Sequence, residues 1–291
     1  MIQYDPKRWP SVVFRLHGSV LPHLLPRVLS VAAVGVGAWQ LHALTGFKLA
    51  PVAHTMVGVA LGLLLVFRTN ASFDRWWEGR KLVGSMVNRT RDLTRQVTHM
   101  IDGDEDLVAR RELRAMIAGF FALTRLHLRA ERDLAPLEAS LGPKLRAALE
   151  PAQHRPVVML SWISARLCDL ARAGHLSEHR LAAMDANLTA LHDYLGGCER
   201  ILRTPVPFAY AQHIKTFLML FTFTAPFAMV DALHGYTPVA AAVLAFALYG
   251  IDEIGVEIED PFGHDANDLP LDAITEGIDA ATSETLDRRA P

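Results

Sequence analysis

Few side chains in this sequence have the types and spacing that metal binding or covalent catalysis requires. Cys168 and Cys198 are the two cysteines, and their separation fits neither a disulfide framework nor a zinc motif. His175 and His179 lie four residues apart, so one helix face could present both, but the sequence offers no third ligand. It contains no nucleophile–base pair, cofactor motif or glycine-rich phosphate loop. We therefore expect no catalytic residue, no enzyme activity and no resident metal or cofactor.

An acidic segment near the C-terminus is the one remaining candidate for cation binding. Its oxygen-bearing side chains are those of Asp260, Asp265, Asn267 and Asp268. Calcium takes about six to eight oxygen ligands, several of them carboxylates, and the spacing here does not match an EF-hand loop. Calcium binding is therefore possible at this segment, but a high-affinity site is not expected.

The most informative spacing in the sequence is that of three apolar residues. Val59, Leu63 and Phe67 recur every four residues, which places them on one face of a helix, with Gly58 and Gly62 beside them. If several copies of this helix surrounded an axis, the face would form three apolar rings. A narrow apolar tube of that kind can gate ions by expelling its water. Periodicity alone favours the simpler interpretation, a stripe that faces lipid or the protein core.

The helix that carries this stripe is one of four apolar stretches long enough to cross a bilayer. A spanning helix needs about 20 mostly apolar residues, and 51% of the chain is hydrophobic. The predicted spans cover about residues 28–44, 51–67, 207–230 and 236–254. Short loops separate the first span from the second and the third from the fourth, so the spans form two hairpins. Buried core helices of a soluble protein are the alternative.

The distribution of positive charge predicts the orientation of these spans. Lysines and arginines precede the first span and follow the second, whereas the loop between them carries only Lys48. The loop between the third and fourth spans has neither lysine nor arginine. By the positive-inside rule, both termini and the middle region are cytoplasmic. We expect a multi-pass protein of the inner (plasma) membrane that contacts membrane lipid and has no nucleic-acid partner.

Between the hairpins, residues 68–204 form a polar region with helical periodicity and no alternating strand pattern. Amphipathic helices are predicted at about residues 110–126, 156–173 and 178–202, with breaks at 102–104, 142–143 and Gly174. The C-terminal tail, about residues 259–291, is acidic, and after Pro270 we expect it to be loosely ordered or wrapped on the surface. The predicted fold is an all-α membrane protein over residues 1–291, with four transmembrane helices and a helical cytosolic region.

Three motifs in this layout resemble those of the bestrophin family. The run from Phe67 to Arg80 (FRTNASFDRWWEGR) is similar to the signature at the end of the second span in bacterial bestrophins, and animal members also have Arg-Trp-Trp there. The run from Thr204 to Tyr210 (TPVPFAY) is similar to the family's entry into the third span. The IEDPFG run that ends at Gly263 resembles the Asn-Pro-Phe-Gly run after the fourth span. With the four-span layout, the resemblance covers nearly the whole chain.

The resemblance implies a homopentameric ion channel that conducts monovalent ions passively through one pore on the five-fold axis. The family's hydrophobic neck maps onto Val59, Leu63 and Phe67, although the family usually has Ile or Phe at the first two positions. The family also has a cytosolic constriction formed by one apolar side chain per subunit. The candidate for this side chain is Leu176, in a segment that lies about where the constriction is expected.

The resemblance also bears on the acidic segment. Animal bestrophins bind Ca²⁺ in a clasp of acidic residues directly after Pro-Phe-Gly. In this chain His264 and Ala266 stand where that clasp has acids. The segment with Asp260, Asp265 and Asp268 is therefore expected to be a vestigial clasp that packs the tail onto a neighbouring subunit.

Selectivity and alternative functions stay open at this point. The family includes anion channels in animals and cation-permeable members in bacteria, and an apolar neck has no charge that would select a sign. Chloride or another anion and a monovalent cation are both candidate permeant ions. A secondary transporter is an alternative. The sequence shows no inverted repeat, which argues against it. A non-conducting membrane scaffold is another, and enlarging its neck would change nothing.

Overall fold

The structure, a computed structural model, describes residues 2, 4–5, 7–15, 17–103 and 107–288. These described residues contain helices and connecting turns but no β-strand. They divide into two compact units. Unit 1 comprises the described residues of Met1–Trp77, Thr204–Pro261 and Asp265–Asp268, and unit 2 comprises those of Glu78–Arg203, Phe262–His264 and Leu269–Pro291.

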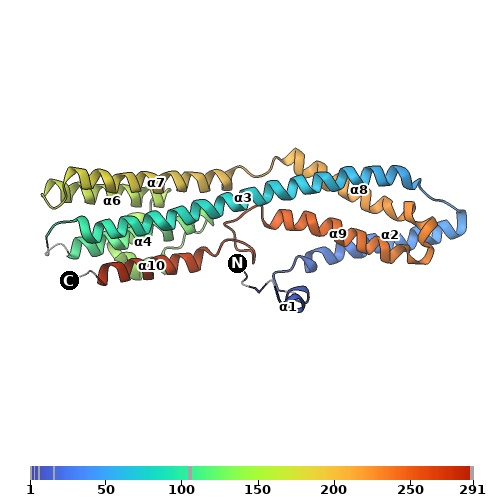
Figure 1. Cartoon of the computed structure of the whole chain (residues 1–291), viewed down its shortest axis with the longest axis horizontal. Coiled ribbons are helices and arrows are strands. Elements are labelled where there is room, and N and C mark those ends of the chain that lie inside the picture. The colour runs from blue at the N-terminus through green and yellow to red at the C-terminus, as the bar shows by residue number, and fades with distance from the viewer. Residues whose placement is uncertain (1, 3, 6, 16, 104–106, 289–291) are drawn as a thin grey trace. The chain divides into compact units, whose positions relative to one another are not determined.

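The described part of unit 1 consists of helices joined by turns (Figure 1). They are α1 (Trp9–Val13), α2 (Leu21–Thr45), the first half of α3 (Pro51–Met100), α8 (Phe208–Leu233) and α9 (Thr237–Glu257). At 1.5 Å per residue, α2, α8 and α9 are about 37, 39 and 31 Å long, enough to cross a hydrocarbon core of about 30 Å. A short 3-10 turn, η2 (His234–Tyr236), reverses the chain between α8 and α9.

Three stretches of the described chain are long and apolar enough to cross a membrane. They are Leu21–Thr45, part of Pro51–Met100, and Phe208–Glu257, which contains both α8 and α9. The predicted spans are therefore confirmed as long apolar helices, each somewhat longer than the sequence indicated. The count of four transmembrane helices stays a prediction.

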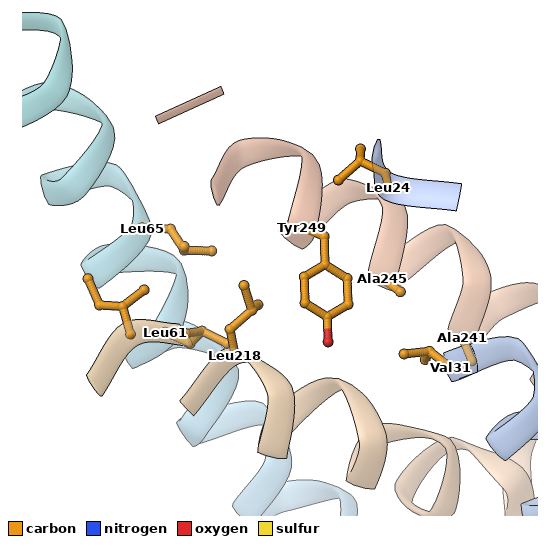
Figure 2. Packing of buried hydrophobic residues seen from close by; sticks show 9 residues of the cluster. Leu24, Val31, Leu61, Leu65, Leu218, Ala241, Ala245 and Tyr249 are labelled. Carbon is orange, nitrogen blue, oxygen red and sulfur yellow. The ribbon is translucent and has the colours of Figure 1, made fainter. Parts of the chain in front are cut away.

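A small apolar core fixes which face of α3 turns inward in unit 1 (Figure 2). Leu61 and Leu65 of α3 belong to one buried cluster with Leu218 of α8 and Tyr249 of α9. The Tyr249 hydroxyl lies 2.8 Å from Thr222 Oγ1, so the polar tip of this buried ring has a hydrogen-bond partner. Since Leu61 and Leu65 face the core, the opposite face of α3 is not covered by the other described helices of unit 1.

The described part of unit 2 consists of helices joined by turns (Figure 1). Its elements are the second half of α3, α4 (Leu107–Leu128), η1 (Ala135–Leu137), α5 (Glu138–Leu149), α6 (Arg155–Arg172), α7 (Glu178–Arg203) and α10 (Leu271–Asp287). Helix α4 is the most buried of them and packs against α5, α6, α7 and α10. The three predicted amphipathic helices are confirmed as α4, α6 and α7. Gly142 and Gly174, at two predicted breaks, have φ of 74° and 84°, which a glycine adopts without strain.

Of the two arrangements expected for the acidic tail, the structure shows the tail wrapped on the surface and not loosely ordered. Residues Leu271–Asp287 form α10, which packs on α4 and buries Ile278 and Leu286. Asp272, in the first turn of α10, accepts hydrogen bonds from Arg125 at 2.8 Å, in the last turn of α4, and from Arg129 at 2.7 Å, directly after that helix. The tail thus lies on the surface of unit 2 as a docked helix, held by apolar contacts and by arginines that composition alone does not pair with it.

Removing the Asp272 charge tests this docking. Hydrogen bonding to Arg129 holds the pKa of Asp272 below its ordinary value, and Arg125 adds to the effect. A lowered folded-state pKa means that the pair stabilises α10 above pH about 4 and loses that contribution as the pH falls through the folded pKa. Because 57% of the side chain is exposed, we expect Asp272→Asn to cost at most about 1 kcal/mol at pH 7.

Hydrogen exchange of the α10 amides measures this cost. At pH 7 the protection factors of the α10 amides should be up to about fivefold lower in the variant than in wild type. This difference should shrink in acid. Glu276→Gln, at an exposed position of the same helix, is the matched control and should leave protection unchanged. Equal protection in Asp272→Asn and wild type would show that the arginine pairs do not hold α10.

Candidate functional site: the exposed apolar stripe of α3

The three predicted neck residues lie on the face of α3 that unit 1 leaves uncovered. Val59 is 71% exposed, and Leu63 and Phe67 are each 56% exposed. On the opposite face, Leu61 and Leu65 are 0% and 1% exposed. The stripe is therefore not part of the subunit core, and the core-facing interpretation of its periodicity is excluded. What remains is contact with lipid or with other copies of the chain.

The uncovered face extends beyond the three predicted positions. At about 100° per residue, Val52, Met56 and Val66 fall on the same side of the helix as Leu63, and all three are exposed. In the other direction the face becomes polar, because Asn70 and Asp74 continue it and are exposed. Sequence reasoning stopped at Phe67 and missed these two residues, although their spacing of three and seven from Phe67 is the signal that places them. We refer to Val59, Leu63 and Phe67 as the apolar stripe.

A glycine helps to seat this helix in unit 1. A Cβ added to Gly58 would lie 3.0 Å from the ring of Phe221 on α8, so the small residue permits close packing of the two helices. At Gly62, a Cβ would meet no described atom within 4 Å. Of the two glycines beside the stripe, Gly58 therefore serves packing within the subunit, and Gly62 leaves open space.

A buried ion pair follows the apolar stripe directly. Arg68 of α3 donates a hydrogen bond to Asp252 of α9, and their side chains are only 2% and 3% exposed. Glu259 lies 3.8 Å from the same guanidinium. Arg68, in the first of the three family-like motifs, thus pairs with an acidic residue near the end of the predicted fourth span. The pair holds the rotation of α3 at the position where the stripe ends.

The three family-like motifs meet in unit 1 through backbone-directed hydrogen bonds. Arg75 donates to the carbonyl oxygen of Glu259 at 3.2 Å and also to that of Thr204. The Glu259 carboxylate accepts a hydrogen bond from the Val206 amide at 3.0 Å. The signature after the second span thus ties together the entry to α8 and the exit from α9, which is a positioning role.

The predicted constriction residue has a different environment from the apolar stripe. Leu176 lies in the turn between α6 and α7, and its side chain is 3% exposed within unit 2. The backbone of this turn is held by a hydrogen bond of 2.8 Å from the Asp102 amide to the His175 carbonyl. A constriction needs a side chain that ions can reach, so the role of Leu176 stays a prediction.

Several polar groups of the segment compared with a calcium clasp form hydrogen bonds within the protein itself. The Asn267 side chain donates to Glu257 at 2.7 Å, and the backbone carbonyl oxygen of Asn267 accepts from Trp76 Nε1 at 3.3 Å. Asp268 is 2% exposed and accepts from the Asp265 amide at 2.7 Å, whereas Asp260 and Asp265 are exposed. These contacts fit a packing role. Calcium binding, which we do not expect at high affinity, stays untested.

Comparison with known proteins now decides the family. A sequence profile described as Bacterial/Fungal Bestrophin protein matches residues 1–284. This chain belongs to the bestrophin family. The resemblance carried by the three motifs is thereby confirmed, and so is the all-α bestrophin fold.

Individual relatives of this bestrophin agree with that placement. It is 40% identical to a voltage-dependent anion channel-forming protein of Nostoc sp., over 92% of this chain and 88% of the relative. A protein of the same description from Synechocystis sp. is 38% identical, over 97% and 93% of the two chains. A crystal structure of a bacterial bestrophin homologue from Klebsiella pneumoniae matches with a TM-score of 0.85 at 29% identity, over 92% of this chain and 99% of that one.

The Arg68–Asp252 pair yields a prediction about stability. Asp252→Asn would leave the buried Arg68 guanidinium without its closest counter-charge, and we expect a loss of about 3 kcal/mol in folding free energy. Thermal denaturation of the detergent-solubilised protein measures it. Glu253→Gln is the matched control, because Glu253 pairs at 2.7 Å with an Arg27 side chain that is 47% exposed, and the cost should stay under about 1 kcal/mol.

Replacing both partners distinguishes an unpaired charge from a general packing defect. Arg68→Met combined with Asp252→Leu removes both charges, so it should recover most of the stability that Asp252→Asn loses. A double variant as unstable as Asp252→Asn would contradict the assignment.

Proposed function

We propose that five copies of this chain surround one axis and form a channel through which monovalent ions pass passively. In this arrangement Val59, Leu63 and Phe67 of each copy line an apolar neck. The observation that carries the proposal is the apolar stripe itself: it is exposed in the subunit, lies opposite the subunit core, and ends at a buried ion pair. Membership of the bestrophin family and the channel-forming description of its relatives support it.

The apolar neck acts on water rather than on charge. Rings of valine, leucine and phenylalanine offer no hydrogen bonds, so a narrow column of water between them is unstable and an ion must shed much of its hydration to enter. The neck is then a gate, and it leaves the choice of ion to polar groups on either side. In the same proposal both termini and unit 2 are cytoplasmic, as the positive-inside rule predicts.

We propose anions as the first candidate for the permeant ion. The support is the description of the relatives from Nostoc and Synechocystis as voltage-dependent anion channel-forming proteins. In this case the neck would admit chloride or a similar monovalent anion, and selection would depend on cationic or amide groups next to it.

A specific observation favours monovalent cations as the second candidate. Asp74 is exposed on the continuation of the face that carries the apolar stripe. Five symmetry-related copies would place a ring of carboxylates beside the neck, and such rings attract cations and repel anions. Asp74→Asn would remove that ring without changing its size.

Flux through reconstituted protein tests the neck. In the triple variant Val59→Ala, Leu63→Ala and Phe67→Ala the neck is wider and stays hydrated more easily, so we expect ion flux at least several-fold above wild type. The matched control is Val239→Ala, Val243→Ala and Phe246→Ala, three exposed apolar residues of α9, which should leave flux unchanged. Absence of flux from both wild type and the neck variant, in correctly folded oligomers, would exclude a channel.

Two further measurements separate the parts of this proposal. The mass of the detergent-solubilised protein should correspond to a pentamer, and a monomer or dimer would contradict a shared pore. Replacing chloride by gluconate, or sodium by a large organic cation, identifies the permeant ion. If cations carry the flux, Asp74→Asn should reduce their preference over anions; if anions carry it, the same variant should increase anion flux.

A further inference from the structure

Three side chains from three different helices of unit 2 converge on one point. They are His127 in the last turn of α4, His154 at the N-cap of α6, and Glu199 on α7. The Nε2 atoms of His127 and His154 lie 2.5 and 2.7 Å from the same carboxylate oxygen, Glu199 Oε1. The two imidazole rings are 4.4 Å apart between centroids. Two ring nitrogens therefore point at one anionic oxygen, and the sequence separations of 72 and 45 residues give no motif that predicts it.

The chemical state of this group suits a metal ligand set. Partial burial raises the pKa of Glu199, but hydrogen bonds from His127 and His154 and the charges of both rings outweigh this effect, so its pKa lies below the ordinary value. Metal coordination uses an ionised carboxylate and neutral imidazoles, so a bound cation would replace the hydrogen bonds between the two rings and Glu199. Arg203 approaches the same oxygen at 3.8 Å, but its side chain is 68% exposed and can move away into solvent.

The ring of His154 can carry its proton on either nitrogen. His154 Nδ1 is buried and has no hydrogen-bond partner among the described residues. The Glu199 carboxylate holds the proton on Nε2 in the absence of a metal. A metal that replaces this hydrogen bond would find the Nε2 lone pair free once the proton sits on Nδ1, where no other hydrogen bond opposes it. The other ligand atoms already lie within 4.8 Å of that nitrogen.

The distances leave a small adjustment for a zinc-sized ion. Zinc binds histidine nitrogen and carboxylate oxygen at about 2.0–2.2 Å, so its ligand atoms lie about 3.3 Å apart in a tetrahedron. The present separations of 2.5 and 2.7 Å would have to widen by less than about 1 Å, which side-chain rotation can supply. Two histidines and one glutamate are a known zinc ligand set, with water as the fourth ligand.

Space for that water is present next to His127. A cavity of about 340 Å³ in unit 2 is lined by His127 together with the carboxylate-bearing Glu131 and Glu150. The lining also includes Arg132 and Arg155, so the wall carries both signs of charge. A water that entered there could bind the metal and donate a hydrogen bond to one of the carboxylates. The side chains of His127 and Glu199 are about one-fifth exposed, so an ion can enter from solvent.

We propose that His127, His154 and Glu199 form a binding site for one divalent transition-metal ion of the zinc class in each subunit, which links α4, α6 and α7. The site differs from the acidic C-terminal segment in its residues and in its ligand chemistry. Two imidazoles favour zinc over calcium or magnesium, which prefer oxygen ligands. The inference does not depend on the proposed pore, because it concerns unit 2 alone.

Zinc binding to the full-length, tag-free protein tests the proposal. After chelation and removal of bound metal, equilibrium dialysis against zinc chloride with elemental analysis should give one saturable zinc per subunit and no comparable calcium binding. Zinc should raise the melting temperature of wild type, because it binds the folded state and ties three helices together. Glu199→Gln keeps the shape of the side chain but removes its charge, and His154→Asn removes the Nε2 ligand atom, so both should lose at least tenfold in zinc affinity and most of the thermal shift.

Control variants keep the outcome unambiguous. The double variant His175→Asn, His179→Asn removes the other closely spaced histidine pair and should bind zinc as wild type does. His154→Cys replaces one zinc ligand with another, so it should restore binding that His154→Asn loses. Cobalt(II) in place of zinc should give the visible absorption of a tetrahedral site in wild type and a thiolate band in His154→Cys. Zinc binding that is absent from wild type, or that survives in folded Glu199→Gln and His154→Asn, would overturn the proposal.

Discussion

The rotation of α3 about its own axis depends on one charged pair in an apolar environment. Arg68 and Asp252 are buried together between α3 and α9, and neither charge could leave the other without a large electrostatic cost. Leu61 and Leu65 alone would tolerate a modest turn of the helix, because apolar contacts have little directional preference. The ion pair removes that freedom. It holds one face of α3 against the core and keeps Val59, Leu63 and Phe67 on the other.

The structure also shows how a polar sequence can form a long, partly buried helix. In the half of α3 that belongs to unit 2, the buried residues Thr90, Thr94 and Thr98 each donate to the carbonyl four residues earlier. Their hydroxyl groups need no partner from another helix, so neighbouring side chains can pack on their methyl groups. Gln96, by contrast, shares a buried hydrogen bond of 2.9 Å with Asn187 of α7. Polar residues here therefore serve both packing within the helix and pairing between helices.

Sequence reasoning recovered the features that depend on local periodicity. The long apolar helices, the amphipathic helices α4, α6 and α7, and the common face of Val59 and Phe67 follow from spacing along one helix. The helix at 271–287 was missed because its stability comes from docking on α4, through Asp272 and Ile278, and composition does not report such contacts. The convergence of His127, His154 and Glu199 was missed for the same reason: three elements distant in sequence must fold together before their ligand atoms meet.

The exposed stripe has a consequence for how the protein is made. In the proposed membrane setting, a single newly inserted subunit would present the exposed Val59, Leu63 and Phe67 to acyl chains, and lipid accepts such side chains as readily as another helix does. An isolated subunit can therefore remain in the bilayer without a chaperone that covers this face. Because the stripe contacts lipid and another helix equally well, it supplies little driving force for assembly. The association of subunits must then depend on polar and close-packing contacts elsewhere. Biogenesis would then be sensitive to subunit density in the membrane and to the lipids that compete for the same surface.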